Sequence, residues 1–352
     1  MSRVLFVSDS FTGYGAEHIL KWLGNNLCIR GYNVTFLSLF EKDRNRELMR
    51  MAESFNLGLP DRIYNRNYFT TGIKFICQQC KIKNYDVVIT FHTNPFLLAL
   101  FARPFCGYKL LHSERDNPYA RDTVLSKLKM WLYRFSDVLV FQTEGARDFF
   151  NEDVKKKSVI IPNPILIPEL RWRGCYSKTL VNVGRLDIRY KRQDLLIKAF
   201  WMICKDNPEY KLCFYGDGID KGRLKKLVIE YGLDDKVEFY GKVDNVQERL
   251  VDEGIFVMTS DSEGMPNALM EAMALGMPVI STDCEPGGAK ALIDSEVNGL
   301  LVERASVEGL STALMRLIED KSMQTRLGDN ARKKMKQFAP DLIFNQWLEC
   351  FK

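Results

Sequence analysis

Short apolar segments alternate with longer segments of helical periodicity along most of the chain. In the first half the apolar segments are Val4–Val7, Val34–Leu39, Val87–Thr90, Val138–Phe141 and Val159–Ile161. A second series comprises Leu180–Val183, Leu212–Tyr215, Val237–Tyr240, Ile255–Met258, Val279–Thr282 and Leu300–Val302. Continuous apolar runs of this length are typical of parallel strands that helices cover on both faces. The pattern therefore predicts an α/β protein built from two successive series of βαβ units.

A proline-rich connection separates the two series. Residues 162–172 contain three prolines, and each of them restricts the preceding residue to extended conformations. A chain of 352 residues also exceeds the usual size of one hydrophobic core. We therefore expect one domain over residues 1–165 and a second over residues 166–337. The last segment, about 338–352, has apolar residues at near-helical spacing and is expected to pack back on the first domain.

Composition excludes several classes of protein. The net charge of +5 is too small to indicate a nucleic-acid-binding protein, and 46% apolar residues are ordinary for a globular chain. No run of 18 apolar residues is present, and the first residues lack a secretory-signal pattern. Nine cysteines, an odd number, fit reduced thiols better than a disulfide framework, which predicts a cytoplasmic protein. Cys77 and Cys80 form a single CxxC pair without further ligands, so no metal site is expected.

Two glutamates mark the segment EGMPNALME, which follows an apolar run of the second series. The pattern predicts a helix over Asn267–Leu275, with Glu263 on the loop before it and Glu271 inside it. The start of a helix presents free backbone amides, which form a site for an anion such as a diphosphate. The candidate binding positions there are Gly264, Met265 and Asn267. The alternative interpretation is a capped helix with a structural ion pair.

Cationic residues crowd the loop that follows Leu180–Val183. Arg185 offers a forked set of donors and Lys191 a compact charge, and both suit a diphosphate that departs as an anion. A glycine-rich turn that contains Gly216 follows the next apolar segment. The alternative for the cationic loop is a solvated basic surface.

The first domain holds two further motifs at predicted strand ends. The loop Gly13-Tyr14-Gly15-Ala16-Glu17 partly mimics a dinucleotide-binding loop, but His18 stands where the third glycine is needed. This disfavours an NAD-dependent oxidoreductase. In KLLHSERDNP, His112 is a candidate for positioning the reacting centre, and Glu114 and Arg115 are candidates for acceptor contacts.

These motifs resemble those of glycosyltransferase family 4, whose members are retaining enzymes of the GT-B fold. EGMPNALME resembles the family's E-x7-E motif, which implies that Glu263 contacts the donor-sugar hydroxyls and Glu271 the nucleotide ribose. The resemblance likewise implies that Arg185 and Lys191 clamp the diphosphate. Family members usually have a glycine after this lysine, whereas this chain has Arg192, so we expect the loop to lack a glycine's backbone freedom.

Looser matches complete the predicted site. The loop at Gly15 is similar to one that approaches the donor phosphates, Gly216 to one near the nucleotide, and His112 to a histidine that faces the donor sugar. Gly287 and Gly288 resemble a further loop near the donor. The predicted catalytic residues are His112, Glu263, Arg185 and Lys191. The predicted donor-binding residues are Gly15, Gly216, Gly264, Met265, Asn267 and Glu271.

The resemblance implies two facing Rossmann-like domains, the first for the acceptor and the second for the nucleotide sugar. It implies transfer of a hexose or N-acetylhexosamine, with retention, from a UDP-sugar to a polyprenyl-diphosphate-linked or polysaccharide acceptor. Capsule or exopolysaccharide assembly would use such an enzyme, and neither a metal nor a cofactor beyond the donor is expected. Two alternatives stay open: a nucleotide-sugar epimerase of the same fold, and a non-catalytic scaffold that binds nucleotide sugars.

One segment of the first domain has a second interpretation. Between residues 124 and 135, lysines and an arginine flank a helical stripe of apolar residues: Val124, Leu125, Leu128, Trp131, Leu132 and Phe135. Such a stripe is most typical of a helix that packs on a core. The alternative is peripheral contact with an anionic membrane, at the inner face of the cytoplasmic membrane.

Overall fold

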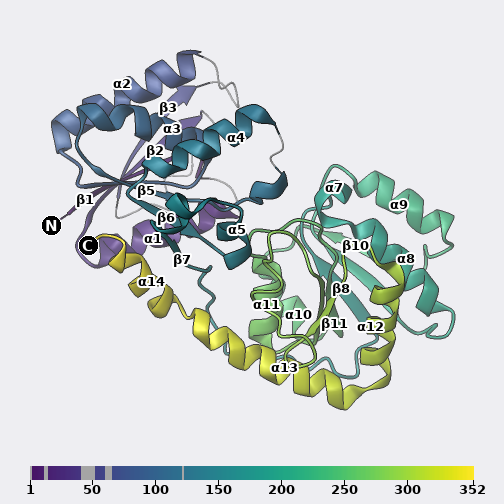
Figure 1. Ribbon diagram of the computed structural model, residues 1–352. Coiled ribbons are helices and arrows are strands. Elements are labelled where there is room, and N and C mark those ends of the chain that lie inside the picture. Colours follow the sequence, from purple (N-terminus) through teal and green to yellow (C-terminus); the bar gives the residue numbers. More distant parts are fainter. Residues whose placement is uncertain (1, 12–14, 41–51, 60–65, 121–122) are drawn as a thin grey trace. The chain divides into compact units, whose positions relative to one another are not determined.

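The computed structural model describes residues 2–11, 15–40, 52–59, 66–120 and 123–352. The chain forms two compact units, which Figure 1 shows. Unit 1 comprises Met1–Asn163 and Ile343–Lys352, and unit 2 comprises Pro164–Leu342. The chain thus passes from unit 1 to unit 2 within the proline-rich connection and returns inside the last helix.

A parallel sheet of seven strands forms the centre of unit 1 in the part of the chain that the structure describes. In spatial order the strands are β3 (Glu53–Leu59), β2 (Asn33–Phe40), β1 (Arg3–Ser8), β4 (Val87–Thr90), β5 (Lys109–Ser113), β6 (Val138–Phe141) and β7 (Ser158–Ile160). The order reverses at β1, where Val4 pairs with Val34 on one side and with Val87 on the other. In open parallel sheets, ligands bind beyond the carboxyl ends of the strands at such a reversal.

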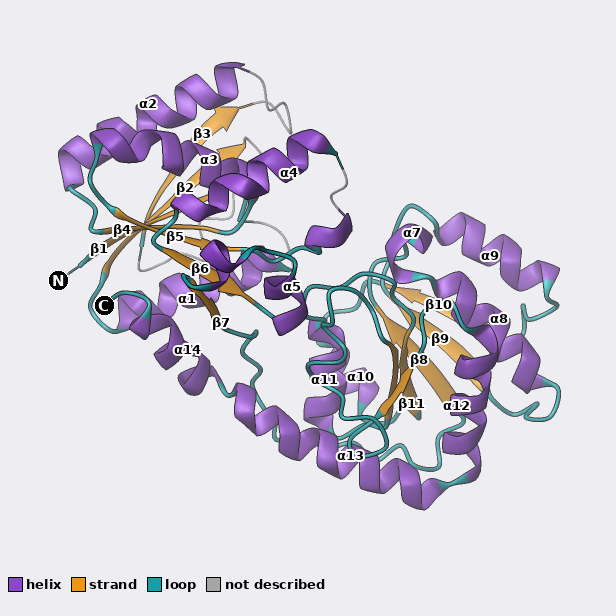
Figure 2. Ribbon diagram, viewed as in Figure 1, coloured by secondary structure: helices purple, strands orange, loops and turns teal. Residues whose placement is uncertain are grey.

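Helices cover both faces of this sheet (Figure 2). One face carries α1 (Ala16–Ile29) and α14 (Pro340–Glu349), and the other carries α2 (Arg66–Lys83), α3 (Thr93–Ala102) and α4 (Val124–Trp131). Shorter helices are η2 (Arg103–Phe105), η3 (Pro118–Ala120), η4 (Leu132–Phe135), α5 (Glu144–Asp148) and α6 (Glu152–Lys155). The C-terminal helix α14 packs on unit 1 through Trp347, whose ring is fully buried and stacks on Phe91 with centroids 6.0 Å apart.

Unit 2 repeats this topology with a parallel sheet of six strands. In spatial order they are β10 (Val237–Gly241), β9 (Lys211–Tyr215), β8 (Thr179–Val183), β11 (Ile255–Met258), β12 (Val279–Thr282) and β13 (Leu300–Val302). The order reverses at β8, which pairs with β9 and β11. The carboxyl ends of these three strands therefore meet at one edge of the sheet, where a ligand site is expected.

Helices also enclose the sheet of unit 2 on both faces (Figure 2). One face carries α8 (Gln193–Cys204), α9 (Lys221–Glu230) and α12 (Val307–Glu319), and the other carries α10 (Val246–Leu250), α11 (Asn267–Leu275) and the second half of α13 (Lys321–Met335). The remaining helices are α7 (Ile188–Lys191) and η5 (Lys336–Phe338). Two apolar cores result, one on each side of the sheet.

The predicted α/β architecture with two parallel sheets is confirmed. Every apolar segment of the two series forms a strand or overlaps one. The strand β3 was missed, because its sequence ESFNLGL lacks an apolar run and its residues from Glu53 to Gly58 are partly or fully exposed at the sheet edge. Edge strands have one neighbour and less burial, so hydrophobic pattern marks them weakly.

The helix α4 contradicts the prediction of an ordinary core helix. Five apolar side chains of α4 and η4 have exposed fractions between 47% and 85%: Val124, Leu125, Leu128, Trp131 and Phe135. Met130 and Tyr133, which are 2% and 0% exposed, face the core instead. The apolar stripe therefore lies on the outer side of the helix, and the opposite side is the one that packs.

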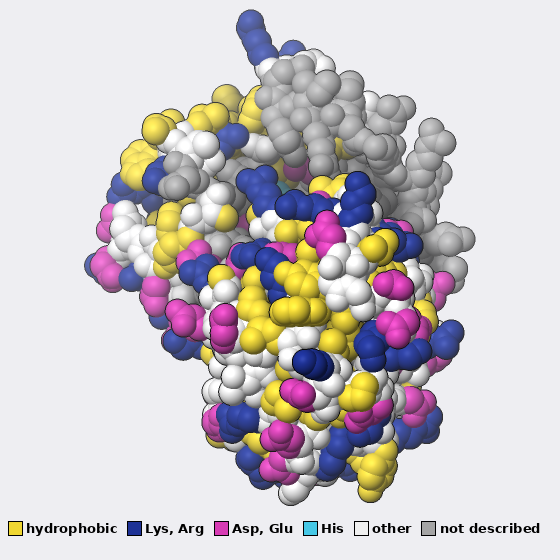
Figure 3. All heavy atoms as spheres, turned by 90° about the vertical axis from the view of Figure 1, so that its right-hand side faces the viewer, with side chains coloured by type: hydrophobic (Ala, Val, Ile, Leu, Met, Phe, Trp, Pro, Cys, Tyr) yellow, Lys and Arg dark blue, Asp and Glu magenta, His cyan; other side chains and the backbone are white. Residues whose placement is uncertain are grey.

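All nine cysteines are free thiols, as their number and spacing predict. No helix among the described residues is both long and apolar enough to cross a bilayer. On the face of the molecule drawn in Figure 3, Lys and Arg side chains are interspersed with Asp and Glu side chains. This mixture agrees with the small net charge of +5.

Candidate functional site

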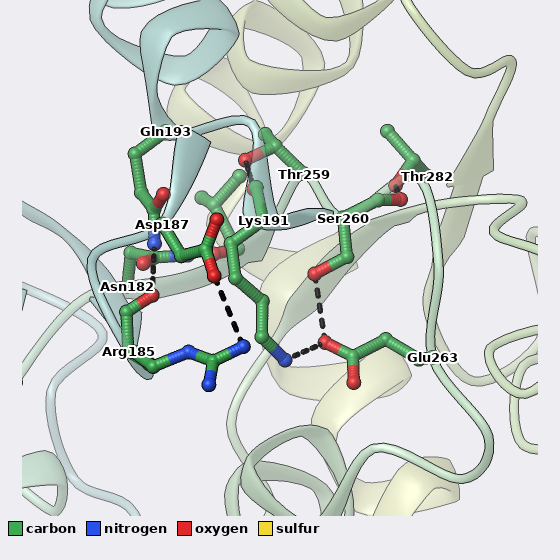
Figure 4. Close-up of polar contacts among 10 residues, drawn as sticks. Asn182, Arg185, Asp187, Lys191, Gln193, Thr259, Ser260, Glu263 and Thr282 are labelled. Atoms are coloured by element: carbon green, nitrogen blue, oxygen red, sulfur yellow. Dashed lines mark hydrogen bonds and ion pairs between the residues drawn. The ribbon is translucent and has the colours of Figure 1, made fainter. Parts of the chain in front are cut away.

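The predicted donor residues of unit 2 gather at the carboxyl edge of its sheet. Arg185 follows β8, Gly216 follows β9, and Glu263 follows β11. Figure 4 shows Arg185, Lys191 and Glu263 side by side, although 78 residues separate the first from the last in sequence. The parallel order of the strands brings these loops together, because each strand ends at the same edge.

Lys191 and Glu263 form an ion pair at this edge. Ser260 Oγ donates a second hydrogen bond to Glu263 Oε1 at 2.8 Å, and Thr259 Oγ1 donates to the backbone oxygen of Lys191 at 2.9 Å. The side chains of Lys191 and Glu263 are 25% and 14% exposed. The pair is thus partly shielded from water but open to a ligand.

Sequence reasoning missed Thr259 and Ser260. Both stand directly after β11, at the position where polar residues reach the ligand edge of a parallel sheet. Their position directly after a predicted strand could have marked both residues as candidates for the site. Ser260 fixes the orientation of the Glu263 carboxylate, and Thr259 fixes the backbone that carries Lys191.

The Glu263 loop packs closely against the loop after β12. Glu263 N–H donates to the backbone oxygen of Glu285 at 2.8 Å, and Glu285 N–H donates to that of Asp261 at 3.1 Å. A Cβ atom at Gly288 would lie 2.4 Å from the backbone oxygen of Gly264, which is far inside van der Waals contact. Glycine at 288 therefore lets the two loops approach each other.

The helix α11 begins at Asn267 and ends at Leu275, as the sequence predicts. Pro266 is its N-cap and provides no side-chain cap, and Gly276 ends it in the left-handed conformation with φ 87°. The helix start, with Gly264 and Met265 before it, lies directly after the Glu263 loop. Its positive end is therefore available beside the Lys191–Glu263 pair to attract an anion.

Glu271 is a largely buried carboxyl group on α11. Burial raises its pKa to about 7. No hydrogen bond or ion pair of its side chain is found within the described part of the chain. Burial of a carboxyl group without a partner costs stability, which makes Glu271 a candidate for contact with a ligand.

Arg185 is the more open of the two cationic residues, with 64% of its side chain exposed. Its Nη2 lies 3.0 Å from Asp187 Oδ2, and Gln193 Nε2 donates to its backbone oxygen at 2.9 Å. The loop is thereby anchored while the guanidinium keeps most of its donors toward solvent.

Arg192 corrects one sequence expectation. The loop was expected to lack a glycine's backbone freedom here, yet Arg192 adopts the left-handed conformation with φ 49° and ψ 41°. Its guanidinium donates to Asp261 Oδ2 at 2.8 Å and to Asp194 Oδ1 at 3.2 Å. These contacts hold a conformation that glycine would adopt without strain.

Gly216 allows the ends of β8 and β9 to lie close together. Its φ is 136°, and a Cβ atom there would lie 1.9 Å from the backbone oxygen of Gly184. Gly184 N–H donates to the backbone oxygen of Tyr215 at 2.9 Å, which joins the ends of β8 and β9. No other residue fits at 216 without moving this edge of the sheet.

In unit 1, Gly15 is the N-cap of α1 at the end of the first βα loop. The neighbouring positions Gly13 and Tyr14 lie outside the described residues. His112 is fully buried near the end of β5, and its ring packs against those of Phe96 and Tyr133 at centroid distances of 4.7 and 4.3 Å. Its Nδ1 lies 3.0 Å from Thr90 Oγ1.

Glu114 and Arg115, the candidates for acceptor contacts, are both buried in unit 1 and hold the protein together. Tyr133 Oη donates to Glu114 Oε2 at 2.8 Å, and Arg115 Nη1 donates to Asn163 Oδ1 at 2.6 Å. The Arg115 guanidinium also covers the ring of Phe91 at 4.6 Å, and burial lowers the pKa of Arg115 to about 9. These contacts lie within unit 1, and a role of the two residues toward the acceptor stays a prediction.

A cavity of about 250 Å³ in unit 1 was not predicted. It lies where β1, β4 and β5 end, and α4 forms one of its walls. Its lining is polar: Asp9, His92, Thr93, Asn94, Asp116, Ser126 and Lys129. These residues come from three loops and from the helices α3 and α4, so only the fold brings them together.

Comparison with known families identifies the activity. Residues 176–334, nearly all of unit 2, match the family model of glycosyl transferases group 1. The protein is a glycosyltransferase. An uncharacterized glycosyltransferase of Haemophilus influenzae is 25% identical over 97% of both chains.

A further relative and a solved structure are similar to this glycosyltransferase over almost its whole length. It is 26% identical, over 99% of its chain and 98% of the relative, to a Campylobacter jejuni alpha-1,4-N-acetyl-D-galactosaminyltransferase that acts on an undecaprenyl-diphosphate-linked glycan. The crystal structure of Anabaena HepE in complex with UDP has a TM-score of 0.83 and 19% identity, and the match covers 99% of both chains. The latter likeness establishes the GT-B fold.

Proposed function

We propose that this enzyme transfers a hexose or N-acetylhexosamine from a UDP-sugar, with retention, to a lipid-linked or polysaccharide acceptor in cell-surface glycan assembly. The observation that carries the proposal is the Lys191–Glu263 pair at the start of α11, with Arg185 beside it. A helix start and two cations suit a diphosphate, and a carboxylate at the same place suits sugar hydroxyls. The undecaprenyl-linked substrate of the Campylobacter relative and the UDP in the HepE structure support the choice of partners.

The leaving diphosphate determines the role of the cations. When the bond from the anomeric carbon to the diphosphate breaks, negative charge develops on the phosphate oxygens. Arg185 and Lys191 neutralise this charge, together with the amides at the start of α11. Lys191 then exchanges its contact with Glu263 for one with the donor phosphate.

The two glutamates bind the hydroxyl groups of the donor, on its sugar and on its ribose. Released from Lys191, the Glu263 carboxylate accepts hydrogen bonds from sugar hydroxyls, and Ser260 keeps it oriented. Glu271 binds the ribose hydroxyls; with its pKa raised to about 7, its carboxyl group can donate as well as accept near neutral pH. These contacts place the anomeric carbon for attack.

Retention follows from attack on the same face from which the diphosphate departs. The acceptor oxygen forms a bond to the anomeric carbon, the bond to the diphosphate oxygen breaks, and the acceptor proton passes to the departing phosphate. The products are the glycosylated acceptor and UDP. Arg185 and Lys191 supply the positive charge that this departure requires, so the proposal uses no metal ion.

Thermal unfolding in the presence of a panel of UDP- and GDP-sugars tests the donor, because selective binding stabilises the folded protein. We expect a UDP-sugar to raise Tm more than its GDP counterpart does. Product analysis by mass spectrometry, with UDP and a labelled acceptor as the expected products, tests the transfer. Conversion of UDP-N-acetylglucosamine to an isomer without acceptor would instead make the protein an epimerase.

A further inference from the structure

The carboxyl end of α11 is held from outside the helix. The last carbonyl groups of an α-helix have no partner within it. Arg332 of α13 donates from Nη1 to the backbone oxygen of Ala274 at 2.5 Å, and Trp172 N–H donates to that of Leu275 at 2.9 Å. A side chain and a backbone amide that are distant in sequence therefore bond the last two carbonyl oxygens of α11.

The same guanidinium binds the proline-rich connection. Its Nη2 donates to the backbone oxygen of Pro168 at 2.7 Å, and its Nη1 also donates to that of Leu170 at 3.0 Å. Both residues belong to unit 2. The planar fork of an arginine carries five N–H donors, so one side chain can bond three carbonyl groups at once in a fixed geometry. Arg332 thus fastens the connection and the end of α11 to α13.

The partners of Arg332 in the described chain are carbonyl oxygens and not a carboxylate. Burial lowers its pKa, and so does the charge of the nearby Arg171, which itself pairs with Asp329 at 2.5 Å. A cation at the carboxyl end of a helix is favourable, because the helix dipole places negative charge there. What the Arg332 side chain stabilises is therefore the position of the three carbonyl groups that it bonds.

The helix α13 packs tightly against the end of α11. A Cβ atom at Gly328, about one turn before Arg332, would lie 2.1 Å from the backbone oxygen of Gly276. Most side chains of α11 are buried: Leu269, Met270, Ala272, Met273, Ala274 and Leu275. A helix of nine residues is only about 13 Å long and moves as one body. A displacement at its carboxyl end therefore reaches its start.

The start of α11 carries the groups that are proposed to bind the donor. Glu271 lies three residues before Ala274, and the helix start follows the Glu263 loop. A displacement of about 1 Å at a reacting centre can cost about 100-fold in rate. The bonds of Arg332 are at the opposite end of the helix, so this residue acts on the donor through α11.

We propose that Arg332 is a positioning residue for the donor: by holding the carboxyl end of α11, it sets the place of Glu271 and of the helix start. The inference rests on the proposed function, because it takes α11 as the helix that binds the donor. Arg332 touches neither substrate and takes no part in bond making. Without its bond to Ala274 the helix shifts, and Glu271 no longer meets the ribose hydroxyls at hydrogen-bond distance.

Calorimetric titration of the full chain with UDP tests the proposal. Arg332→Met keeps the stem of the side chain and removes its donors, and we expect Kd for UDP to rise about tenfold, as for the loss of one hydrogen bond to a charged group. Arg332→Lys keeps the charge but bonds fewer carbonyl groups, so its Kd should rise about threefold. In steady-state transfer, Arg332→Met should raise KM for the donor about tenfold and leave KM for the acceptor unchanged. A residue that only stabilised the fold would lower the apparent kcat and change neither KM.

The matched control is Arg316→Met. Arg316 donates to the two carboxylate oxygens of Glu296 at 2.7 and 2.8 Å, and it lies in α12, which covers the opposite face of the sheet from α11. This variant should keep the parent Kd for UDP, whatever its urea unfolding shows. A parent-like Kd in Arg332→Met, or in Arg332→Lys if the methionine variant does not fold, would overturn the proposal. A parent chain that binds no UDP would contradict the proposed function and this inference with it.

Discussion

Arg192, in the left-handed backbone conformation, donates from Nη1 to Asp261 Oδ2 at 2.8 Å. The contact joins the segment after β8, which carries Lys191, to the segment after β11, which carries Glu263. The backbone conformation costs a residue with a Cβ atom about 1–2 kcal/mol. The ion pairs of Arg192 with Asp261 and Asp194 offset that cost and fix the spacing of the two loops.

Substitution at 192 separates backbone strain from side-chain contacts. We expect Arg192→Ala to lower the free energy of unfolding by about 1–2 kcal/mol more than Arg192→Gly, since only glycine adopts φ 49° without strain. Urea unfolding of both variants measures the difference. Arg189→Ala, an exposed position in α7, is the control and should change stability by less than about 0.5 kcal/mol. Equal stability of the Ala and Gly variants would show that the conformation at 192 carries no strain.

The Lys191–Glu263 pair should be essential for transfer. We expect Lys191→Met and Glu263→Gln each to lower kcat/KM by at least about 100-fold, because each removes a contact to the reacting donor. Ser260→Ala removes one hydrogen bond to Glu263 and should cost only about fivefold. Initial rates of UDP release measure all three.

A control accompanies these variants. Lys205→Ala removes an exposed lysine of unit 2 outside the site and should keep the parent rate. A Lys191→Met enzyme with normal kcat/KM would remove this pair from the mechanism.

Glu271 makes stability depend on pH. Its folded pKa of about 7 lies above the unfolded value of 4.5, so the folded protein holds this proton more tightly. The resulting stability is complete below pH 4.5 and is lost as pH rises to about 7, a total of roughly 3 kcal/mol. Glu271→Gln has no such proton, so its stability relative to the parent chain should rise by about 2–3 kcal/mol between pH 5 and pH 8. Urea unfolding at the two pH values measures the change, and a pH-independent difference would contradict a buried, partnerless carboxyl group.

Substitution of His112 tests whether a fully buried imidazole takes part in transfer. The sequence predicts a catalytic role, and the side chain is 0% exposed and packs against Phe96 and Tyr133. We expect His112→Phe to lower kcat by at least about 100-fold, because it removes the imidazole, and thermal unfolding measures what the larger phenyl ring costs this buried site. Phe96→Leu is the control, because it disturbs the same packing and leaves the imidazole. If both variants lose activity only in proportion to folded protein, His112 is structural.

Much of the fold was predictable because parallel strands buried on both faces leave continuous apolar runs. The strands β4, β6, β11, β12 and β13 have the predicted bounds. The edge strand β3 was not predicted, since burial on one side alone leaves no such run. The outward direction of the α4 stripe was also not predictable, because periodicity shows that a helix has two sides and not which side meets the core.

Part of the candidate site was predictable for a similar local reason. Glu263, Arg185 and Lys191 stand next to strand ends, and a strand end is visible in sequence. The contact of Asp261 with Arg192 was missed because a hydrogen bond between loops 69 residues apart has no local signature. Ser260 lies only three residues before Glu263, but the hydrogen bond between their side chains depends on how the loop folds. The polar cavity of unit 1 was missed because its lining comes from loops and helices that are separate in sequence.

By itself the sequence determined the element types, the two series of strands, the helix Asn267–Leu275 and the chemical character of each loop. These depend on neighbouring residues and on the period of apolar positions, which any short segment contains. Only the tertiary structure decided that Lys191 pairs with Glu263, that Arg192 adopts a glycine-like conformation, and that α4 presents its apolar side to solvent. Each of those outcomes depends on which distant segment lies nearby, and packing of the whole unit determines that.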